Sequence, residues 1–154
     1  MVRGGLFDDV DIVLHWHPDD VNGASAMTNN SNKSAKFTFK GISAHAAGAP
    51  ELGRSALDGV ESMNLMVNMM REHMPQSSRI HYVITKGGLA PNVVPDLAQV
   101  YYYVRHPKMD MVEELFERVV KTAQGAAMGT ETSVSYEVMH ENYSLLPNTV
   151  LQKL

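Results

Sequence analysis

The order of its periodic segments constrains the fold of this chain more than any other feature of the sequence. Four stretches alternate apolar and polar residues, as strands with one buried face do, and two carry apolar residues at the spacing of an α-helix. The order along the chain is strand, helix, strand, strand, helix, strand, which predicts an α+β, ferredoxin-like fold. In this fold two helices cover one face of a four-stranded antiparallel sheet. The expected bounds are 36–40, 56–74, 79–85, 98–105, 111–128 and 132–138.

The ends of both predicted helices carry recognisable signals. Ser55 is placed to cap the first helix, with Asp58 three residues later, and this helix is expected to stop before Pro75. Asp110 is placed to cap the second helix, and Gly129 to terminate it. Because this architecture hosts many unrelated activities, function must be argued from particular residues.

The first helix is more apolar than a helix covering a sheet needs to be. Leu65, Met66 and Met69 lie off its inward stripe and would be exposed to water in a monomer. This surplus predicts a homodimer contact through the first helix and the edge strand 79–85, although scattered apolar surface residues are the alternative. The inward stripe itself is expected to comprise Leu57, Val60, Met63, Val67, Met70 and Met74.

Composition narrows the class of protein. A chain of 154 residues with 44% hydrophobic residues can bury one ordinary core, or two small ones. Its net charge of −4 argues against a nucleic-acid partner, and no apolar run reaches the roughly 18–20 residues of a membrane span. The absence of cysteine excludes a disulfide, a zinc–thiolate site and a thiol nucleophile. Residues 1–9 lack the apolar core of an export signal, which favours a cytoplasmic location.

Two histidines follow a short apolar run near the N-terminus. Residues 12–14 are continuously apolar, as in a strand covered on both faces, and the run ends at His15, His17 and Pro18. In a strand, His15 and His17 would point to the same face, which suits the binding of one or two metal ions. Two histidines without further ligands are half a site, and histidines bonded to the backbone are the alternative. Residues 19–34 have the composition of a loop or linker.

Three further residues are candidates for a functional site. His45 lies in a Gly-rich loop, where it could donate a proton, stabilise an oxyanion or have no role. Asn92 could offer its amide to a ligand or cap a turn. Arg105, at the end of a Tyr-rich strand, could clamp a carboxylate or pair with a surface acid. The other histidines have no supporting pattern and are expected to be structural: His73, His81, His106 and His140.

Five segments together resemble a known family. They are residues 11–18 (DIVLHWHP), 39–47 (FKGISAHAA), 50–58 (PELGRSALD), 88–95 (GLAPNVVP) and 103–105 (YVR). In this order, they resemble the zinc-dependent aminoacylases and carboxypeptidases that carry an inserted peptidase dimerisation, or lid, domain. Residues 53–58 and 144–148 (SLLPN) fit best the branch of these amidohydrolases that contains the B-subunit of p-aminobenzoyl-glutamate hydrolase.

The resemblance implies a role for each candidate residue. His17 matches the family's metal-binding histidine at the end of a catalytic-domain strand, whereas the role of His15 stays open. His45 matches the lid histidine that reaches across the dimer and stabilises the oxyanion in the partner's active site. Asn92 and Arg105 match positions that hold the carboxylate end of the substrate. The implied reaction is hydrolysis of an amide bond beside a carboxylate, as in an N-acyl amino acid or p-aminobenzoyl-glutamate, with zinc or manganese as the divalent metal.

The chain also departs from the family pattern, because the family's catalytic domain flanks the lid on both sides and supplies further metal ligands and a glutamate base. We therefore expect residues 1–24 and 143–154 to be stubs of a catalytic domain and residues 25–142 to form the lid. Alone, such a fragment is expected to be inactive and to bind no metal tightly. The alternative is a free-standing, ferredoxin-like module that binds small anions through Arg105 and the Gly-rich loops. The flanking reading frame would distinguish the two.

Overall fold

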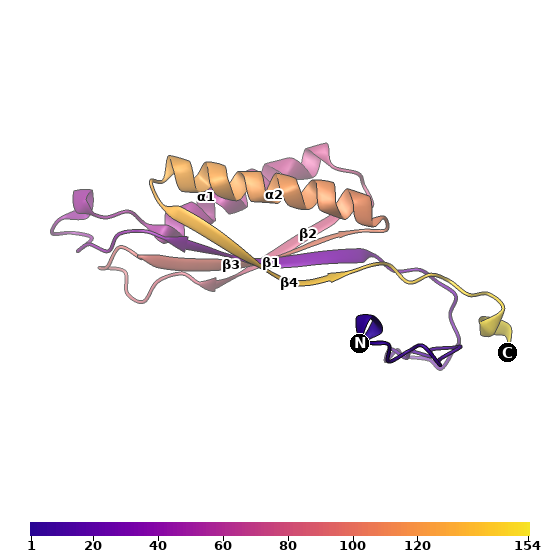
Figure 1. Ribbon diagram of the computed structural model, residues 1–154. Coiled ribbons are helices and arrows are strands. Elements are labelled where there is room, and N and C mark those ends of the chain that lie inside the picture. The colour runs from indigo at the N-terminus through magenta and orange to yellow at the C-terminus, as the bar shows by residue number, and fades with distance from the viewer. The chain divides into compact units, whose positions relative to one another are not determined.

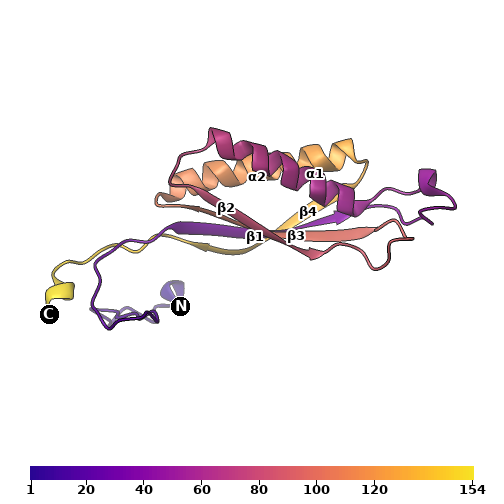
Figure 2. The same cartoon turned by 180° about the vertical axis from the view of Figure 1, so that it is seen from behind.

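A four-stranded antiparallel sheet, with both helices packed on one of its faces, forms the main unit of this protein (Figures 1 and 2). The computed structural model describes all 154 residues. The strand order β2-β3-β1-β4 places β2 and β4 at the two edges of the sheet. The α+β, ferredoxin-like prediction is therefore confirmed. The elements are β1 (Ser31–Lys40), α1 (Ala56–Met69), β2 (Arg79–Lys86), β3 (Leu97–His106), α2 (Met109–Gly129) and β4 (Ser133–Asn142).

The core lies between the helices and the sheet, where the alternation predicts it. Alternate residues of β1 and β3 face the helices and are fully buried. Near the centre, the rings of Phe37 and Tyr102 meet edge to face, with their centroids 5.9 Å apart. The Tyr102 hydroxyl donates a hydrogen bond to the side-chain oxygen of Asn64 in α1. The fully buried residues of these two strands are Ala35, Phe37, Phe39, Ala98, Val100, Tyr102 and Val104.

The first strand begins earlier than the sequence predicts. Residues 31–34 belong to the stretch of loop composition, yet they pair with β3 on one side, and residues 32–34 also pair with β4 on the other. Ser31 and Ser34 are almost fully buried in this pairing. Backbone pairing with two neighbouring strands outweighs the weak strand propensity of these polar residues.

The helices differ from their predicted bounds and caps in small ways. The α-helical part of α1 ends at Met69, and a short 3-10 helix, Met70–His73, continues it. Ser55 caps α1 as predicted, since its hydroxyl accepts from the Asp58 amide. Lys108, not Asp110, occupies the N-cap position of α2, which provides no side-chain cap. Met66 is half-buried against the core instead of being exposed.

Residues 1–26 and 148–154 form a second, smaller unit. Its only regular elements are two 3-10 helices, Val2–Gly4 and Leu151–Lys153. The strand expected at residues 12–14 is absent, and Leu14 and Trp16 are 85% and 79% exposed. Because a strand needs a neighbouring strand for its backbone groups, an apolar run without one stays irregular. No helix in the chain is long and apolar enough to cross a membrane.

Candidate functional site

His45 lies in the long loop that joins β1 to α1. Two isolated antiparallel bridges organise this loop, one between Ile42 and Arg54 and one between His45 and Val93. The second bridge joins it to the loop between β2 and β3, which contains Asn92. The Ala46 amide donates to the Asn92 carbonyl oxygen at 2.9 Å. The two Gly-rich loops singled out in the sequence therefore lie together at one end of the sheet.

The ring of His45 is oriented by its own backbone. Its Nδ1 atom accepts hydrogen bonds from the amides of Ala47 at 3.2 Å and Gly48 at 3.0 Å. Because Nδ1 accepts, the neutral ring carries its proton on Nε2. His45 is exposed, so this Nε2–H group faces solvent as a hydrogen-bond donor. Such a donor is suited to stabilising negative charge on an oxygen atom.

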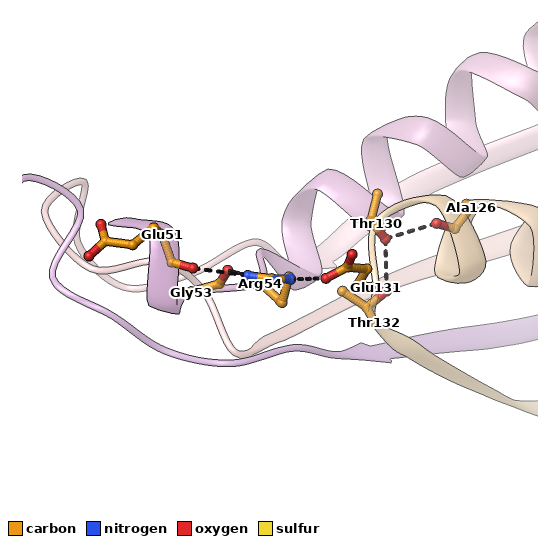
Figure 3. Close-up of polar contacts among 7 residues, drawn as sticks. All are labelled: Glu51, Gly53, Arg54, Ala126, Thr130, Glu131 and Thr132. Atoms are coloured by element: carbon orange, nitrogen blue, oxygen red, sulfur yellow. Dashed lines mark hydrogen bonds and ion pairs between the residues drawn. The ribbon is translucent and has the colours of Figure 1, made fainter. Parts of the chain in front are cut away.

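Arg54 fastens the base of this loop to the turn that follows α2 (Figure 3). Its guanidinium donates to the carbonyl oxygens of Glu51 at 3.2 Å and Gly53 at 2.6 Å, and forms an ion pair with Glu131. Glu131 has a φ of 53°, a left-handed conformation that non-glycine residues seldom adopt. The contacts of Arg54 limit the motion of the segment that carries His45.

A cavity of about 400 Å³ lies between the loop that joins β2 to β3 and the N-terminus of α1. Ser55 and Asp58 line it from the helix, and Gly88 and Pro95 line it from the loop between β2 and β3. Gly88 has a φ of 109°, which L side chains rarely adopt, so glycine is required at this turn. Asn92 is exposed nearby.

Arg105 lies at the opposite end of β3, beside a second cavity of about 590 Å³. Its guanidinium carbon is 5.2 Å from the centre of the Tyr103 ring, and its Nε–H group is buried without a hydrogen-bond partner. Arg105 also has no acidic partner in the chain, because the ion pairs involve only Lys33 and Arg54 as cations. A half-buried, unpaired guanidinium in a polar cavity is a candidate site for an anion. The other residues that line this cavity are Thr28, Asn29, Asn30, Asn32, Pro107, Asn142 and Tyr143.

Asn32 and His140 belong to this second cluster, and neither was a candidate from sequence. Asn32 pairs directly with Arg105 in the sheet, and its side-chain nitrogen lies 2.7 Å from Nε2 of His140. The two residues are 108 positions apart, so only the strand register brings them together. The alternation of β1 could have placed Asn32 on the face opposite Phe37, but its neighbours there depend on the β-bulge between Ser34 and Ala35.

His17 is exposed in the smaller unit. Its Nδ1 atom donates to the Pro18 carbonyl oxygen at 2.8 Å, so the lone pair of Nε2 is available to a metal ion. However, no three His, Asp or Glu side chains in the chain converge to hold a metal ion, and His15 adds only one potential ligand. The residues present therefore do not by themselves fit the divalent metal that the resemblance implies.

The candidate residues thus form two clusters at opposite ends of the sheet. His45 and Asn92 lie near the start of β3, and Arg105 lies near its end. The eight steps from Leu97 to Arg105 span about 27 Å at the rise of an extended strand. Asn92 and Arg105 of one chain therefore cannot both contact one small carboxylate group.

Comparison with known proteins identifies the peptidase dimerisation domain that the sequence resemblance implies. Residues 28–130 match the family model described as the peptidase dimerisation domain. The chain is 46% identical over 153 residues to the B-subunit of p-aminobenzoyl-glutamate hydrolase from Escherichia coli, covering 99% of this chain and 32% of that protein. It is 28% identical over 152 residues to the Xaa-Arg dipeptidase of Mus musculus, covering 98% of this chain and 35% of that protein. The chain therefore spans about a third of the length of these curated relatives.

Solved structures share the fold at lower sequence identity. An aminobenzoyl-glutamate utilization protein from Klebsiella pneumoniae aligns with a TM-score of 0.67 at 24% identity, over 80% of this chain and 32% of that one. An amidase of the hydantoinase/carbamoylase family from Burkholderia vietnamiensis aligns with a TM-score of 0.74 at 16% identity, over 82% and 31% of the two chains. The family match, the sequence relatives and the shared fold agree. This chain belongs to the peptidase dimerisation domain family.

Proposed function

We propose that this chain serves as the dimerisation and lid domain of a metal-dependent amidohydrolase. The proposed substrate is an amide whose leaving amino acid carries a carboxylate, as in an N-acyl amino acid. The names of two relatives, p-aminobenzoyl-glutamate hydrolase and Xaa-Arg dipeptidase, describe substrates of this general kind. In this proposal Arg105 binds the carboxylate, and Nε2–H of His45 stabilises the oxyanion that forms at the amide carbon.

The observation that carries the proposal is the separation of the two clusters along β3. A substrate bound by Arg105 cannot reach His45 of the same chain, because about 27 Å of strand lies between them. A second copy of the chain, turned by a two-fold axis, would bring its own His45 end beside this Arg105. The site is therefore shared between two subunits in this proposal, with Arg105 from one and His45 and Asn92 from the other.

The edge formed by β2 suits this arrangement better than the edge formed by β4. If two β2 strands pair antiparallel, the two β3 strands are three strand spacings apart, or about 14 Å. Pairing through β4 would separate them by five spacings, or about 24 Å. Because antiparallel pairing reverses one sheet, the Arg105 end of one subunit then faces the His45 end of the other.

Apolar side chains also remain uncovered along the β2 edge. The side-chain nitrogen of Asn68 lies 3.4 Å from the Tyr82 hydroxyl, which places that side of α1 over β2. Leu65 of α1 and Ile84 of β2 are 57% and 45% exposed there, and Met69, the last residue of α1, is 60% exposed. Burying side chains of this size stabilises a contact by roughly 1.5–3 kcal/mol each, before the cost of association.

The remaining assignments concern the metal. We propose that His17 contributes one ligand to a divalent zinc or manganese ion whose other ligands lie outside this chain. When bound, such an ion would supply an activated water as the nucleophile. The contribution of this chain is then to bind the substrate carboxylate at Arg105 and to present the His45 donor. The chain alone is expected to give no turnover of p-aminobenzoyl-glutamate with added zinc or manganese, and turnover above a His17→Ala control would contradict this.

Light scattering at a protein concentration of roughly tens of micromolar tests whether the chain is a dimer. The unmodified chain is expected to be a dimer, and the double variant Leu65→Lys, Met69→Lys a folded monomer. Met128→Lys is the matched control, because Met128 is 82% exposed at the end of α2, away from β2. Met66 is left unchanged because it packs against the core. A monomeric unmodified chain would contradict the shared site.

A second candidate is an anion-binding module without catalysis. The unpaired guanidinium of Arg105 and its cavity favour it, because neither feature requires a second copy of the chain. The two candidates differ in their prediction for His45. In an enzyme that also supplies the other metal ligands, only the shared site predicts that His45→Ala in one subunit lowers the activity contributed by the Arg105 of the other.

A further inference from the structure

The open face of the sheet carries two rows of polar residues around Arg105. Strand pairing defines each row, because residues directly opposite one another share a face. Neither row contains an Asp or Glu, so no carboxylate of the protein occupies this end of the face. The first row is Arg79, Arg105, Asn32 and Asn142, and the second is His81, Tyr103, Ser34 and His140.

The side chain of Asn32 is only half satisfied in this setting. Its Nδ2 atom lies 2.7 Å from Nε2 of His140, while its Oδ1 atom is buried without any hydrogen-bond partner. This contact joins two nitrogen atoms, but its length of 2.7 Å lies at the short end of the range for an N–H···O bond. Turning the amide by 180° exchanges the two atoms, so that Oδ1 accepts from Nε2–H of His140. The amide NH₂ group then takes the buried position that has no hydrogen-bond partner in the protein, and both Asn32 and Arg105 line the cavity of about 590 Å³.

His140 is held in place independently of Asn32. Its Nδ1 atom lies 2.9 Å from the Ser34 hydroxyl oxygen. Its ring meets the ring of Tyr103 edge to face, with the two ring centroids 5.0 Å apart. Ser34 is fully buried, so the position of the imidazole is fixed by packing as well as by hydrogen bonds. The imidazole can therefore determine which end of the Asn32 amide it binds and which end is left for a ligand.

We propose that Asn32 and Arg105 form a two-residue clamp for a carboxylate, and that His140 is the positioning residue that turns the Asn32 NH₂ group toward it. Directly opposed residues on neighbouring strands have Cβ atoms about 4.5–5.5 Å apart, so both side chains reach one carboxylate. The guanidinium donates to one carboxylate oxygen and the amide donates to the other. This rests on the proposed function, in which Arg105 binds the substrate carboxylate.

The clamp is tested on the whole chain by NMR titration with hippurate, a benzoylated amino acid with one carboxylate. Saturable shifts of the Asn32 and Arg105 side-chain N–H signals are expected with hippurate, and none with its uncharged amide. Asn32→Leu is expected to weaken binding at least about tenfold, as loss of a hydrogen bond to a charged group does. Gln99→Leu is the matched control, because Gln99 lies on the same face at the other end of β3 and should leave binding unchanged.

The role of His140 is read from the Asn32 amide signals. His140→Leu is expected to weaken binding and to remove the hippurate shift of the Asn32 NH₂ group, whereas His140→Gln, which can still donate to Oδ1, retains both. If Arg105→Gln abolishes binding while Asn32→Leu does not, the clamp is wrong and the proposed function stands. If Arg105→Gln leaves binding unchanged, or if the unmodified chain does not respond to hippurate, the carboxylate assignment of Arg105 fails as well.

Discussion

Replacing Gly41 with alanine is expected to displace the loop that carries His45. Gly41 directly follows β1 and lies against the segment that leads into α1. A Cβ atom at this position would be 1.9 Å from the Arg54 carbonyl oxygen and 2.9 Å from the Ala56 amide nitrogen. Both are main-chain atoms, so rotation of a side chain cannot relieve the overlap. The two backbone segments must move apart.

The size of the effect follows from the contacts that this movement breaks. A carbon–oxygen contact needs about 3.3 Å, so the segments must separate by more than about 1 Å. The two hydrogen bonds between Ile42 and Arg54, of 2.8 and 2.9 Å, would then exceed bonding distance. Two lost hydrogen bonds and the residual strain together lower the free energy of unfolding by about 2–5 kcal/mol.

Gly125→Ala is the matched control for this substitution. Gly125 lies within α2, and a Cβ atom there would meet nothing within 4 Å. Alanine is a better helix former than glycine, so the control is expected to stabilise the protein by about 0.5–1 kcal/mol. Urea unfolding followed by circular dichroism measures both changes, and amide NMR shifts of residues 44–48 report on the loop. A loss below about 1 kcal/mol for Gly41→Ala with unchanged loop shifts would refute the reasoning.

Three further substitutions test other contacts. The Lys33 ammonium, 3.1 Å from the Glu141 carboxylate, holds the pKa of that carboxyl below its usual 4.5. Because the carboxylate form is favoured in the folded protein, the ion pair stabilises the fold fully above pH 4.5. This stabilisation is lost as the pH falls through the lower pKa of the folded state. Lys33→Met should return the pKa of Glu141 toward 4.5 in an NMR titration and weaken the acid dependence of unfolding. Tyr102→Phe leaves the buried Asn64 oxygen unpaired and should cost about 1–3 kcal/mol in thermal unfolding, whereas an unchanged melting temperature would contradict the bond. Arg54→Gln should speed amide exchange in the loop that Arg54 fastens while lowering global stability by less than about 1 kcal/mol, because the ion pair is largely exposed.

The fold was predictable because elements with one buried face repeat their apolar residues at a period that is visible in the sequence. Residues 98–105 were expected to form a strand with one buried face, and their alternate residues Ala98, Val100, Tyr102 and Val104 are fully buried. The start of β1 was missed because residues 31–34 are polar, and their pairing depends on strands that are distant in sequence. Local composition carries no information about such partners.

The candidate site was predictable only in part, for a similar reason. The motif around His45 identifies a loop, and the structure adds the two backbone donors that fix its ring tautomer. Arg105 could be proposed from its place at a strand end, but the sequence cannot show that no acid pairs with it. His140 was expected to be structural, because its contact with Asn32 exists only in the assembled sheet.

The two units of the chain should differ in how their backbones are protected from exchange with solvent. In β3, backbone groups pair with β1 on one side and β2 on the other, so their amides can exchange only when the sheet opens. Residues 11–18 lie in no strand or helix, and their large apolar side chains are exposed. Hydrogen exchange is therefore expected to be close to the unprotected rate in residues 11–18 and limited by global unfolding in β3. Equal protection of the two segments would mean that residues 11–18 are held by contacts as strong as those of the sheet.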